Sequence, residues 1–393
     1  MNGTGNNGIQ NNTMKNVLVT GGAGLIGSHL VDLLLREGHT VTVLDNLEPQ
    51  THPHGKPDWI PKAVRWIQGD LRNESDVKKA LEGVEWVFHQ AAFGGFSPAL
   101  TQYMDVNASG TARLFEVIRA QLLPVEKIVV ASSQAIYGEG LYHCAVHGEL
   151  SPPLRPRSQM IQADWEMRCP HCHQPMTSCA TPEVAALNGE TIYAISKMAE
   201  ERLALSLGKW LEIPTVALRY AVTYGPRQSI FNPYTGVVSI FSTRLLNNKP
   251  PVIYEDGRQT RDFLFVEDNV RANLFVMQHP DTAYQAYNVG TGQPTRIDEL
   301  VGILANIYGK STLTPEISGG FRPGDVRHFS HDANKLKALG WAPTVKLQEG
   351  LSRYVSWIEE QSDIRDYFDE AQRLLSEMKV VINPVGVLPK VPS

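Results

Sequence analysis

The stretch "LVTGGAGLIGSHLVDLLL", residues 18–35, decides the fold. An apolar run ending at Thr20 predicts a buried strand over 16–20, and apolar residues at helical spacing predict a helix over 24–37. Between them lie Gly21, Gly24 and Gly27, which let the backbone turn tightly and approach a pyrophosphate at the helix N-terminus. The spacing is GxxGxxG, and by itself it is also compatible with a plain turn. In this setting it predicts a dinucleotide site, with Leu25 and Ile26 in the same turn.

The rest of the first half repeats this alternation of strand and helix. Further strands are expected over 40–45, 63–70, 84–90 and 126–132, with helices over 74–82 and 107–122. Such alternation favours a parallel sheet covered by helices on both faces. The expected fold is therefore α/β, a Rossmann-type doubly wound parallel sheet with a smaller C-terminal substrate-binding α/β part.

The domain organisation follows from where this rhythm stops and returns. Residues 139–190 are rich in Pro, Cys and His and have no clear period, and we interpret them as an insert. From 191 a helix to about 212 and a strand over 214–220 resume the pattern. The expected segments are a leader (1–14), an NAD-binding domain (15–138 and 191–225) interrupted by the insert (139–190), a mainly substrate-binding domain (226–383) and a tail (384–393).

Composition excludes several classes of function. The chain has 393 residues and a formal net charge of −5, so it lacks the clustered basic charge of a nucleic-acid-binding protein. Its apolar runs are far shorter than a membrane span. The polar start does not resemble a secretory signal, and four cysteines make no disulfide scaffold. We expect a cytosolic protein that contacts neither nucleic acid nor membrane.

Two acidic positions refine the cofactor expectation. Asp45 closes the second expected strand, where a carboxylate accepts hydrogen bonds from the adenosine ribose and repels a 2′-phosphate, which favours NAD over NADP. A solvated turn residue is the alternative. Asp70 and Leu71 end another strand and are expected near the adenine, although Asp70 is also compatible with a helix N-cap.

Tyr193 and Lys197 stand four residues apart in "ETIYAISKMAEERLAL", on one face of the expected helix. A nearby ammonium and a positively charged nicotinamide ring both stabilise a phenolate, which makes Tyr193 usable as a general base. Ser132 and Ser133 end the strand in "VVASSQAIYG" and are placed to hydrogen-bond a reacting oxygen. Each motif has a plain alternative, a surface pair or a capped turn, but their agreement favours the chemical interpretation.

Taken together, the motifs resemble the extended short-chain dehydrogenase/reductases, in particular the NAD-dependent nucleotide-sugar epimerases and dehydratases. The resemblance covers about residues 15–360 and is carried by "VTGGAGLIGSHL", "VLDNL", "FHQAA", "VVASSQAIYG", "YAISK", "LRYAVTYGPRQ", "GRQTRDFLFVEDNVRA" and "RPGDVRH". Within the family, "YGEG", "NPYTGV" and "FSTRLLNN" are most similar to the dTDP-L-rhamnose 4-epimerase and UDP-galactose 4-epimerase groups. The resemblance also implies a homodimer paired through helices 107–122 and 191–212.

The resemblance implies roles for matching positions. For the cofactor these are the glycine turn for the pyrophosphate, Asp45 and Asn46 for the ribose, Asp70 and Leu71 beside adenine, and Ala91, Ala92, Asn107, Ser132, Tyr193 and Lys197. Ser133, Tyr193 and Lys197 would be catalytic, and Ser133, Asn232, Arg261 and Arg322 would bind substrate. Val222 departs from the pattern, because relatives commonly carry Asn in "RYFNVYGP" where this chain has "RYAVTYGP".

The same resemblance indicates which of the family's reactions this chain favours. A 4,6-dehydratase usually carries an Asp-Glu pair directly after the catalytic Ser/Thr, and a decarboxylase of the UDP-xylose synthase type resembles a pattern with Glu there. This chain has Gln134 and Ala135, which cannot shuttle a proton. The expectation is a nucleotide-sugar 4-epimerase with tightly held NAD. The alternatives are another such enzyme (a 3,5-epimerase, decarboxylase or 4,6-dehydratase) and a non-catalytic protein that binds NAD or a nucleotide sugar.

The insert carries its own pattern. Cys144 and His147 form a C-x-x-H pair, Cys169 and Cys172 form a C-x-x-C pair, and 21 residues separate the two pairs. Two such pairs match the layout of a structural Cys3His zinc site. Free cysteines, a disulfide and fortuitous spacing are the alternatives, and four other residues are possible fourth ligands: His143, His171, His173 and Cys179. We expect the closed loop to wall the sugar pocket.

Overall fold

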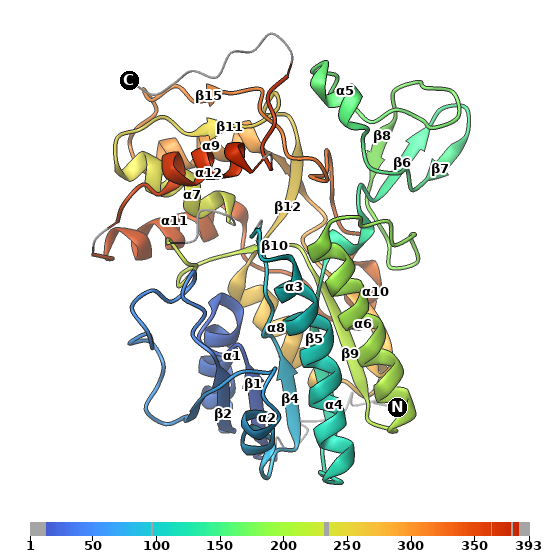
Figure 1. The fold of residues 1–393 in the computed structure, drawn as a ribbon, viewed down its shortest axis with the longest axis vertical. Helices are drawn as coiled ribbons and strands as arrows, with labels where there is room; N and C mark the ends of the chain where they lie inside the picture. The colour runs from blue at the N-terminus through green and yellow to red at the C-terminus, as the bar shows by residue number, and fades with distance from the viewer. Residues whose placement is uncertain (1–12, 96, 232–235, 363, 379, 385–393) are drawn as a thin grey trace, which may run out of the picture.

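A seven-stranded parallel sheet forms the base of the molecule in the computed structural model, which describes residues 13–95, 97–231, 236–362, 364–378 and 380–384. The strand order is β13-β9-β5-β4-β1-β2-β3 (Figure 1). Their bounds are β1 Asn16–Thr20, β2 Thr40–Asp45, β3 Arg65–Gln68, β4 Trp86–His89, β5 Lys127–Ser133, β9 Thr215–Tyr220 and β13 Gln285–Val289. The order reverses between β1 and β4, which is where ligands bind in open α/β sheets.

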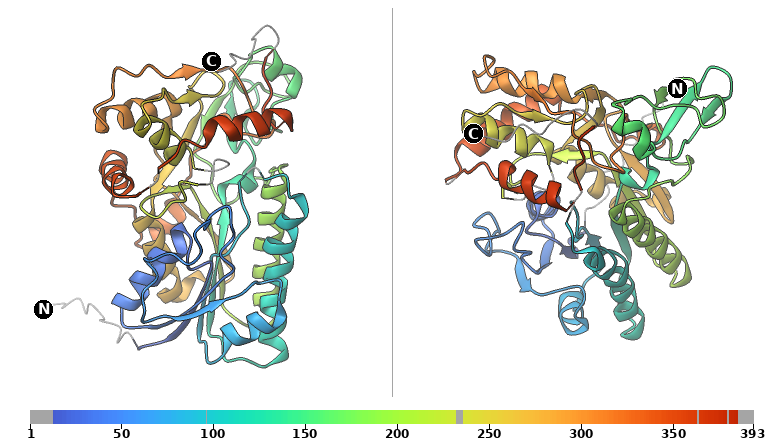
Figure 2. Two further views of the ribbon diagram at one scale, coloured as in Figure 1. Left: turned by 60° about the vertical axis from the view of Figure 1, so that its left-hand side comes forward. Right: turned by 45° about the horizontal axis from the view of Figure 1, so that its top comes forward.

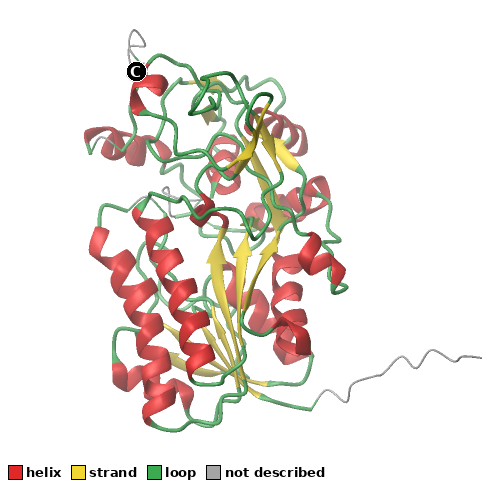
Figure 3. Cartoon of the chain, turned by 90° about the vertical axis from the view of Figure 1, so that its right-hand side faces the viewer, coloured by secondary structure: helices red, strands yellow, loops and turns green. Residues whose placement is uncertain are grey.

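Helices cover both faces of this sheet, as the sequence predicts (Figure 3). On one face lie α2 (Glu74–Leu81), α4 (Gly110–Ala120) and α6 (Ile192–Trp210), which share a core with Leu18, Val87 and Ile128. On the other lie α1 (Leu25–Arg36) and α8 (Val266–Gln278), packed over Val19, Phe88 and Val129. The sequences of these strands are nearly continuous apolar runs because both faces of the sheet are buried.

The helix expected over 107–122 begins earlier and is not uniform. It starts as α3 (Leu100–Gln102), continues through a π-helical segment, Tyr103–Ser109, and becomes α4 only at Gly110. Polar residues in 100–109 hide the apolar period, so the sequence did not reveal this start. π-Helical turns are frequent at functional sites.

The C-terminal part forms a second, smaller unit at the carboxyl end of the sheet (Figure 2). A three-stranded sheet, β10 (Val222–Tyr224), β12 (Thr260–Phe265) and β14 (Pro294–Arg296), packs with α7 (Val237–Leu246), α9 (Ile297–Ile307) and α11 (Leu347–Glu359). The remaining elements are β11 (Val252–Ile253), β15 (Glu316–Ile317), α10 (Asn334–Ala338), α12 (Phe368–Glu377) and two 3-10 turns, Gln134–Tyr137 and Pro280–Thr282.

One segment inside 226–383 returns to the first domain. β13 pairs with β9, and α8 packs in the core of the large sheet. The segment 226–383, which we expected to be mainly substrate-binding, therefore contains two elements, β13 and α8, that belong with the large sheet. Composition alone did not reveal this return, because the chain crosses between the units without a linker-like stretch.

The insert folds into a small antiparallel sheet of its own. β6 (Leu141–Cys144) lies between β7 (Gly148–Leu150) and β8 (Thr177–Cys179) in the sheet, and α5 (Arg157–Ile161) lies between β7 and β8 along the chain. The unit stands beside the C-terminal part (Figure 1). One small cluster around β6 consists of Tyr142, Cys144, Met167, Cys169 and Met176, and a second joins Met160 and Trp165 of the insert to Phe321. Over the described residues, no helix in the protein has the length and apolar character needed to cross a membrane.

Candidate functional site

A cavity of about 370 Å³ opens where the strand order reverses, at the carboxyl ends of β1, β2 and β4. Its lining includes most of the residues predicted to bind the dinucleotide: Gly21, Gly24, Asp45, Asn46, Asp70, Leu71, Ala91, Ala92 and Tyr193. The structure therefore brings together, in one cavity, motifs that lie far apart along the chain.

The glycine turn is built so closely that side chains would not fit. Gly21 has φ +68°, and a Cβ there would lie 2.7 Å from Cα of Ala91. A Cβ on Gly27 would lie 2.1 Å from the carbonyl oxygen of Gly21. Gly24 is the N-cap of α1, and no described side chain bonds to the cap. The helix N-terminus thus remains available to an anion, and the cradle fits a pyrophosphate.

Asp45 is held rigidly at the edge of this cavity. Its Oδ2 accepts the backbone N–H of Ala23 and its Oδ1 accepts that of Leu47, both at 2.9 Å. Each carboxylate oxygen can accept a second hydrogen bond, which leaves capacity for two ribose hydroxyls. This geometry fits the role expected from the sequence.

Asp70 is tied to its neighbours rather than to a helix end. Its carboxylate accepts hydrogen bonds from Arg72 and, at 3.2 Å, from the Asn46 amide, and the Arg72 bond is the main reason that its pKa is lowered. The N-cap of α2 is Asn73, so the alternative that Asp70 caps this helix is wrong.

Asn107 holds the loop that carries the cavity wall after β4. Its Oδ1 accepts the N–H of Phe93 at 2.7 Å, and its Nδ2 donates to the Phe93 carbonyl and to Ser196 Oγ, both at 2.9 Å. Asn107 lies in the π-helical segment, fully buried. It links this loop to α6, the helix of Tyr193.

Tyr193 stands at the junction of two cavities. It lines the dinucleotide cavity and also a second cavity of about 550 Å³ between the two units. Gly95 is the other described residue common to both linings. A side chain at this junction can reach a cofactor on one side and a substrate on the other.

Lys197 follows Tyr193 by one helical turn and is buried. Its Nζ donates to Oε2 of Glu200 at 2.6 Å. Burial raises the pKa of Glu200 to about 7, although the Lys197 charge opposes this shift. Glu200 was not predicted from the sequence, where it read as one more charge on a helix. Its position three residues after Lys197 was the available signal.

The two serines at the end of β5 have different surroundings. Ser132 donates to Oε2 of Glu201 at 2.6 Å, in a buried group that also contains Arg219. The Ser132 hydroxyl therefore donates its proton to Glu201, and its expected contact with the cofactor stays a prediction. Ser133 accepts the N–H of Ala135 at 3.1 Å, and its own proton remains available. Neither serine is among the described residues that line the cavities.

The second cavity is lined by two of the residues predicted to bind substrate, Arg261 and Arg322, but not by Ser133. Val222, Gln134 and Ala135 also line it. Arg261 donates to Oδ1 of Asp325 at 2.6 Å, and the Arg322 guanidinium lies over the Tyr254 ring. Asn232, also expected to bind substrate, lies outside the described residues.

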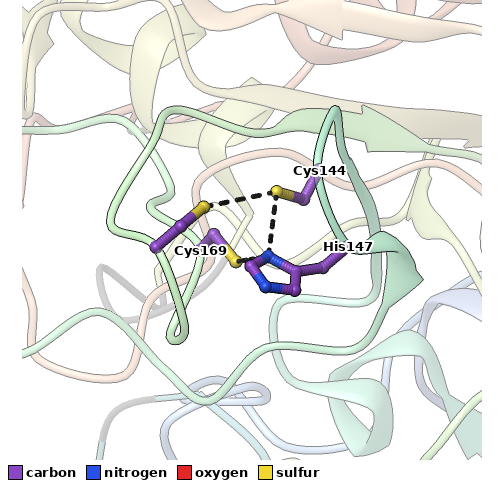
Figure 4. A group of neighbouring side chains, drawn as sticks. Cys144, His147 and Cys169 are labelled. Carbon is purple, nitrogen blue, oxygen red and sulfur yellow. Dashed lines mark hydrogen bonds between the residues drawn. The ribbon is translucent and has the colours of Figure 1, made fainter.

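The cysteine and histidine pairs of the insert converge on one point. The ligand atoms of Cys144, His147, Cys169 and Cys172 all lie within 4.8 Å of one another (Figure 4). All four cysteines of the chain are free, so the disulfide alternative is wrong. Hydrogen bonds from the backbone of Val146 and His147 lower the pKa of Cys144 to about 6. The other candidate ligands, His143, His171, His173 and Cys179, are not in this group of described residues.

Comparisons with known proteins agree with this geometry. The model of the NAD dependent epimerase/dehydratase family matches residues 17–160 and 170–290. The chain belongs to this family. It is 32% identical to a dTDP-L-rhamnose 4-epimerase from Burkholderia thailandensis, over 89% of this chain and 96% of the relative.

Solved structures give the same result. A UDP-glucose 4-epimerase from Thermus thermophilus in complex with NAD is similar, with a TM-score of 0.67 and 31% identity over 88% of this chain and 99% of that one. A Thermotoga maritima UDP-glucose 4-epimerase with UDP-glucose has a TM-score of 0.70 and 29% identity over the same shares. The expected family, the Rossmann-type fold and the epimerase relationship are thus confirmed.

Proposed function

We propose that this protein is an NAD-dependent nucleotide-sugar 4-epimerase. The observation that carries the proposal is the position of Tyr193, at the junction of the glycine-cradled cavity and the cavity that contains Arg261 and Arg322. The family supports the reaction class, and the similar proteins include epimerases of dTDP- and UDP-sugars.

In this proposal the protein moves one proton and orients two ligands. NAD, when bound, supplies the acceptor and later the donor of the hydride at C4. Tyr193 would take the proton of the sugar 4-hydroxyl through its phenolic oxygen as C4 is oxidised to a ketone, and would return that proton when C4 is reduced again. Inversion at C4 would require the keto sugar to turn over in the second cavity between these two proton transfers. Lys197, one helical turn after Tyr193, would stabilise negative charge that develops on the reacting oxygen, and Ser133 would hydrogen-bond that oxygen.

The second cavity supports epimerisation over elimination. Gln134 and Ala135 line it directly after Ser133, and neither side chain can exchange a proton with C5 or C6. Arg261 and Arg322 would bind the diphosphate, because guanidinium groups suit such an anion. Asp45 would bind the adenosine ribose and favour NAD.

A product assay tests the proposal. The protein is incubated with UDP-glucose, UDP-glucuronate and dTDP-L-rhamnose in turn, and the products are followed by NMR. Formation of the 4-epimer of at least one sugar, with no net change in NADH absorbance, is expected. Binding without conversion of any sugar would contradict it and favour a sensor, and loss of water from a sugar would favour a dehydratase.

A structural zinc ion in the insert is part of the proposal. Ligands placed about 2.3 Å (S) and about 2.0 Å (N) from a common tetrahedral centre lie about 3.5–3.8 Å apart. Here Cys144 Sγ lies 3.6 Å from Cys172 Sγ, and His147 Nδ1 lies 3.7 and 3.4 Å from the sulfurs of Cys144 and Cys169. Elemental analysis of untagged protein should give about one zinc per chain, and zinc-free folded protein would contradict this.

The proposal also includes a cytosolic homodimer. Four free cysteines fit a reducing compartment. α4 and α6 lie side by side (Figure 1), and Ile195 and Trp210 of α6 are exposed. A dimer paired through these helices would bury both side chains. Light scattering that gives the monomer mass would contradict the dimer.

A further inference from the structure

The metal-ligand group of the insert lies next to the residues that dock the insert onto the substrate-binding unit. Tyr142, two residues before Cys144, accepts the N–H of His328 at 3.2 Å through its hydroxyl oxygen. Glu166, three residues before Cys169, accepts hydrogen bonds from Arg327 at 2.6 Å and from His328 at 3.2 Å. Each of the two ligand pairs therefore lies within three residues of a side chain that hydrogen-bonds the loop around residues 325–328.

A buried network of charged side chains also connects the insert to the substrate-binding unit. Arg155 of the insert binds both carboxylate oxygens of Glu255, at 3.1 and 2.9 Å, and donates to the Asp325 carbonyl at 2.9 Å. Arg327 is fully buried and binds Glu255 at 2.9 Å and Asp256 at 2.6 Å. Glu139, at the start of the insert, accepts the N–H of Arg327 at 2.7 Å. Such networks stay rigid only while every charged partner is in place.

The same loop forms a wall of the substrate cavity. Arg322 and Asp325 line it, and Asp325 holds Arg261 at 2.6 Å, while Leu154 of the insert contributes directly to the lining. Glu166 and Arg155 thus connect the part of the insert that holds the Cys/His group to the cavity wall. This wall contains Arg261 and Arg322, which are proposed to bind the diphosphate. The cofactor cavity contains no insert residue in its described lining.

The part of the insert around the Cys/His group has a small apolar core of its own. Among the described residues this cluster has five buried members, and two of these are the ligands Cys144 and Cys169. A unit with so small a core depends on a metal or another cross-link for its order.

We propose that the metal bound by Cys144, His147, Cys169 and Cys172 is a positioning element of the substrate site, which acts through Glu166 and Arg155 on the wall that carries Arg261 and Arg322. This inference rests on the proposed function for the identity of its ligand. Loss of the metal would weaken binding of the nucleotide diphosphate and leave NAD binding as it is.

Three single variants test the inference. Cys172→Ser removes a half-buried ligand, whereas Cys179→Ser changes the cysteine outside the group, whose sulfur contacts only the Thr177 carbonyl, at 3.8 Å, among described partners. Glu166→Gln leaves the ligands intact and weakens the link to Arg327. For each, zinc content is measured by elemental analysis, affinity for UDP, dTDP and NAD by calorimetry, and kcat and KM with the sugar that the wild type converts.

C172S is expected to lose zinc, to weaken UDP or dTDP binding and raise KM at least about tenfold, and to change NAD affinity less than about twofold. E166Q should keep its zinc and shift KM in the same direction, and C179S should match the wild type. Loss of zinc with unchanged nucleotide affinity would overturn the inference, as would equal loss of NAD and nucleotide binding. Wild-type protein that binds UDP or dTDP but converts no sugar would contradict the proposed function alone.

Discussion

Lys197 Nζ lies 2.6 Å from Oε2 of Glu200, and both side chains are buried within the helix that carries Tyr193. The other carboxylate oxygen of Glu200 has no hydrogen-bond partner among the described residues. Lys197, which the proposed chemistry uses, is therefore paired with Glu200 through one oxygen, while the other Glu200 oxygen accepts no hydrogen bond from a described residue. This pair links the reaction centre to the stability of the fold.

Replacing Glu200 by Gln should flatten the pH dependence of stability. Burial raises the pKa of Glu200 to about 7 from 4.5, so the folded state binds a proton that the unfolded state has already lost. Glu200 therefore makes the fold less stable as pH rises from about 4.5 to 7, by about 3 kcal/mol in total. Urea unfolding at pH 5 and 7.5 should show a smaller loss in E200Q than in the wild type.

The matched control for this measurement is Glu74→Gln, which removes an exposed carboxylate paired with Lys78. The pKa of Glu74 is lowered by that lysine, so its titration lies below the tested window. E74Q should retain the wild-type slope between pH 5 and 7.5. A slope in E200Q equal to that of the wild type would show that Glu200 is not protonated in the folded state near neutral pH.

Replacing Tyr193 by Phe should abolish turnover without loss of NAD. Positioned general bases contribute about 10²- to 10⁴-fold to rate, and the ring alone still fills the junction of the two cavities. NMR of the sugar product should show a fall in kcat of at least about a hundredfold, with NAD affinity changed less than about threefold. Turnover retained in Y193F would remove the tyrosine from the mechanism.

Asp45→Asn should weaken NAD binding and reduce the preference over NADP. The amide has one acceptor oxygen in place of two, and both carboxylate oxygens already accept backbone N–H groups. Hydrogen bonds to a charged group are worth about 1.5–3 kcal/mol, which corresponds to about ten- to a hundredfold in affinity. Calorimetry with both cofactors measures this. Asp58→Ala, an exposed acid on the following loop, should bind like the wild type.

Gly27→Ala should disrupt the cofactor cradle. The new Cβ would lie 2.1 Å from the Gly21 carbonyl oxygen, so α1 or the turn must move. Overpacking of this kind costs about 1–3 kcal/mol, and NAD binding should fall with it. Gly302→Ala in α9 is the control, because its Cβ would meet no described atom within 4 Å. It should leave NAD affinity unchanged, and equal effects of the two variants would contradict the close fit.

Features set by local sequence were predictable. The β1–α1 turn, Asp45 at the end of β2 and the Tyr193–Lys197 spacing depend on neighbours within one element, and the structure places them as expected. The Cys/His group was also predictable, because each pair is held by a short turn and the spacing limits the geometry. Asn107 was expected near the cofactor, but its hydrogen bonds to Phe93 were not foreseen.

Features set by contacts between distant segments were not predictable. Glu166 meets His328 across 162 positions of the chain, and no local pattern marks either residue. The return of β13 to the large sheet depends on its pairing with β9, which composition does not encode. Ser132 and Ser133 look equivalent in sequence, and only the buried Glu201 beside one of them separates their environments.

Transfer of a hydrogen at C4 is tested most directly with a nucleotide sugar carrying deuterium at that carbon, incubated with the NAD-loaded protein in ordinary water. UDP-glucose, UDP-glucuronate and dTDP-L-rhamnose labelled in this way are the probes. The account predicts a 4-epimer that keeps its deuterium at C4, with no solvent hydrogen entering C3 or C5. The account would be contradicted if the product lost its deuterium to the solvent. It would also be contradicted if none of the three labelled sugars were converted.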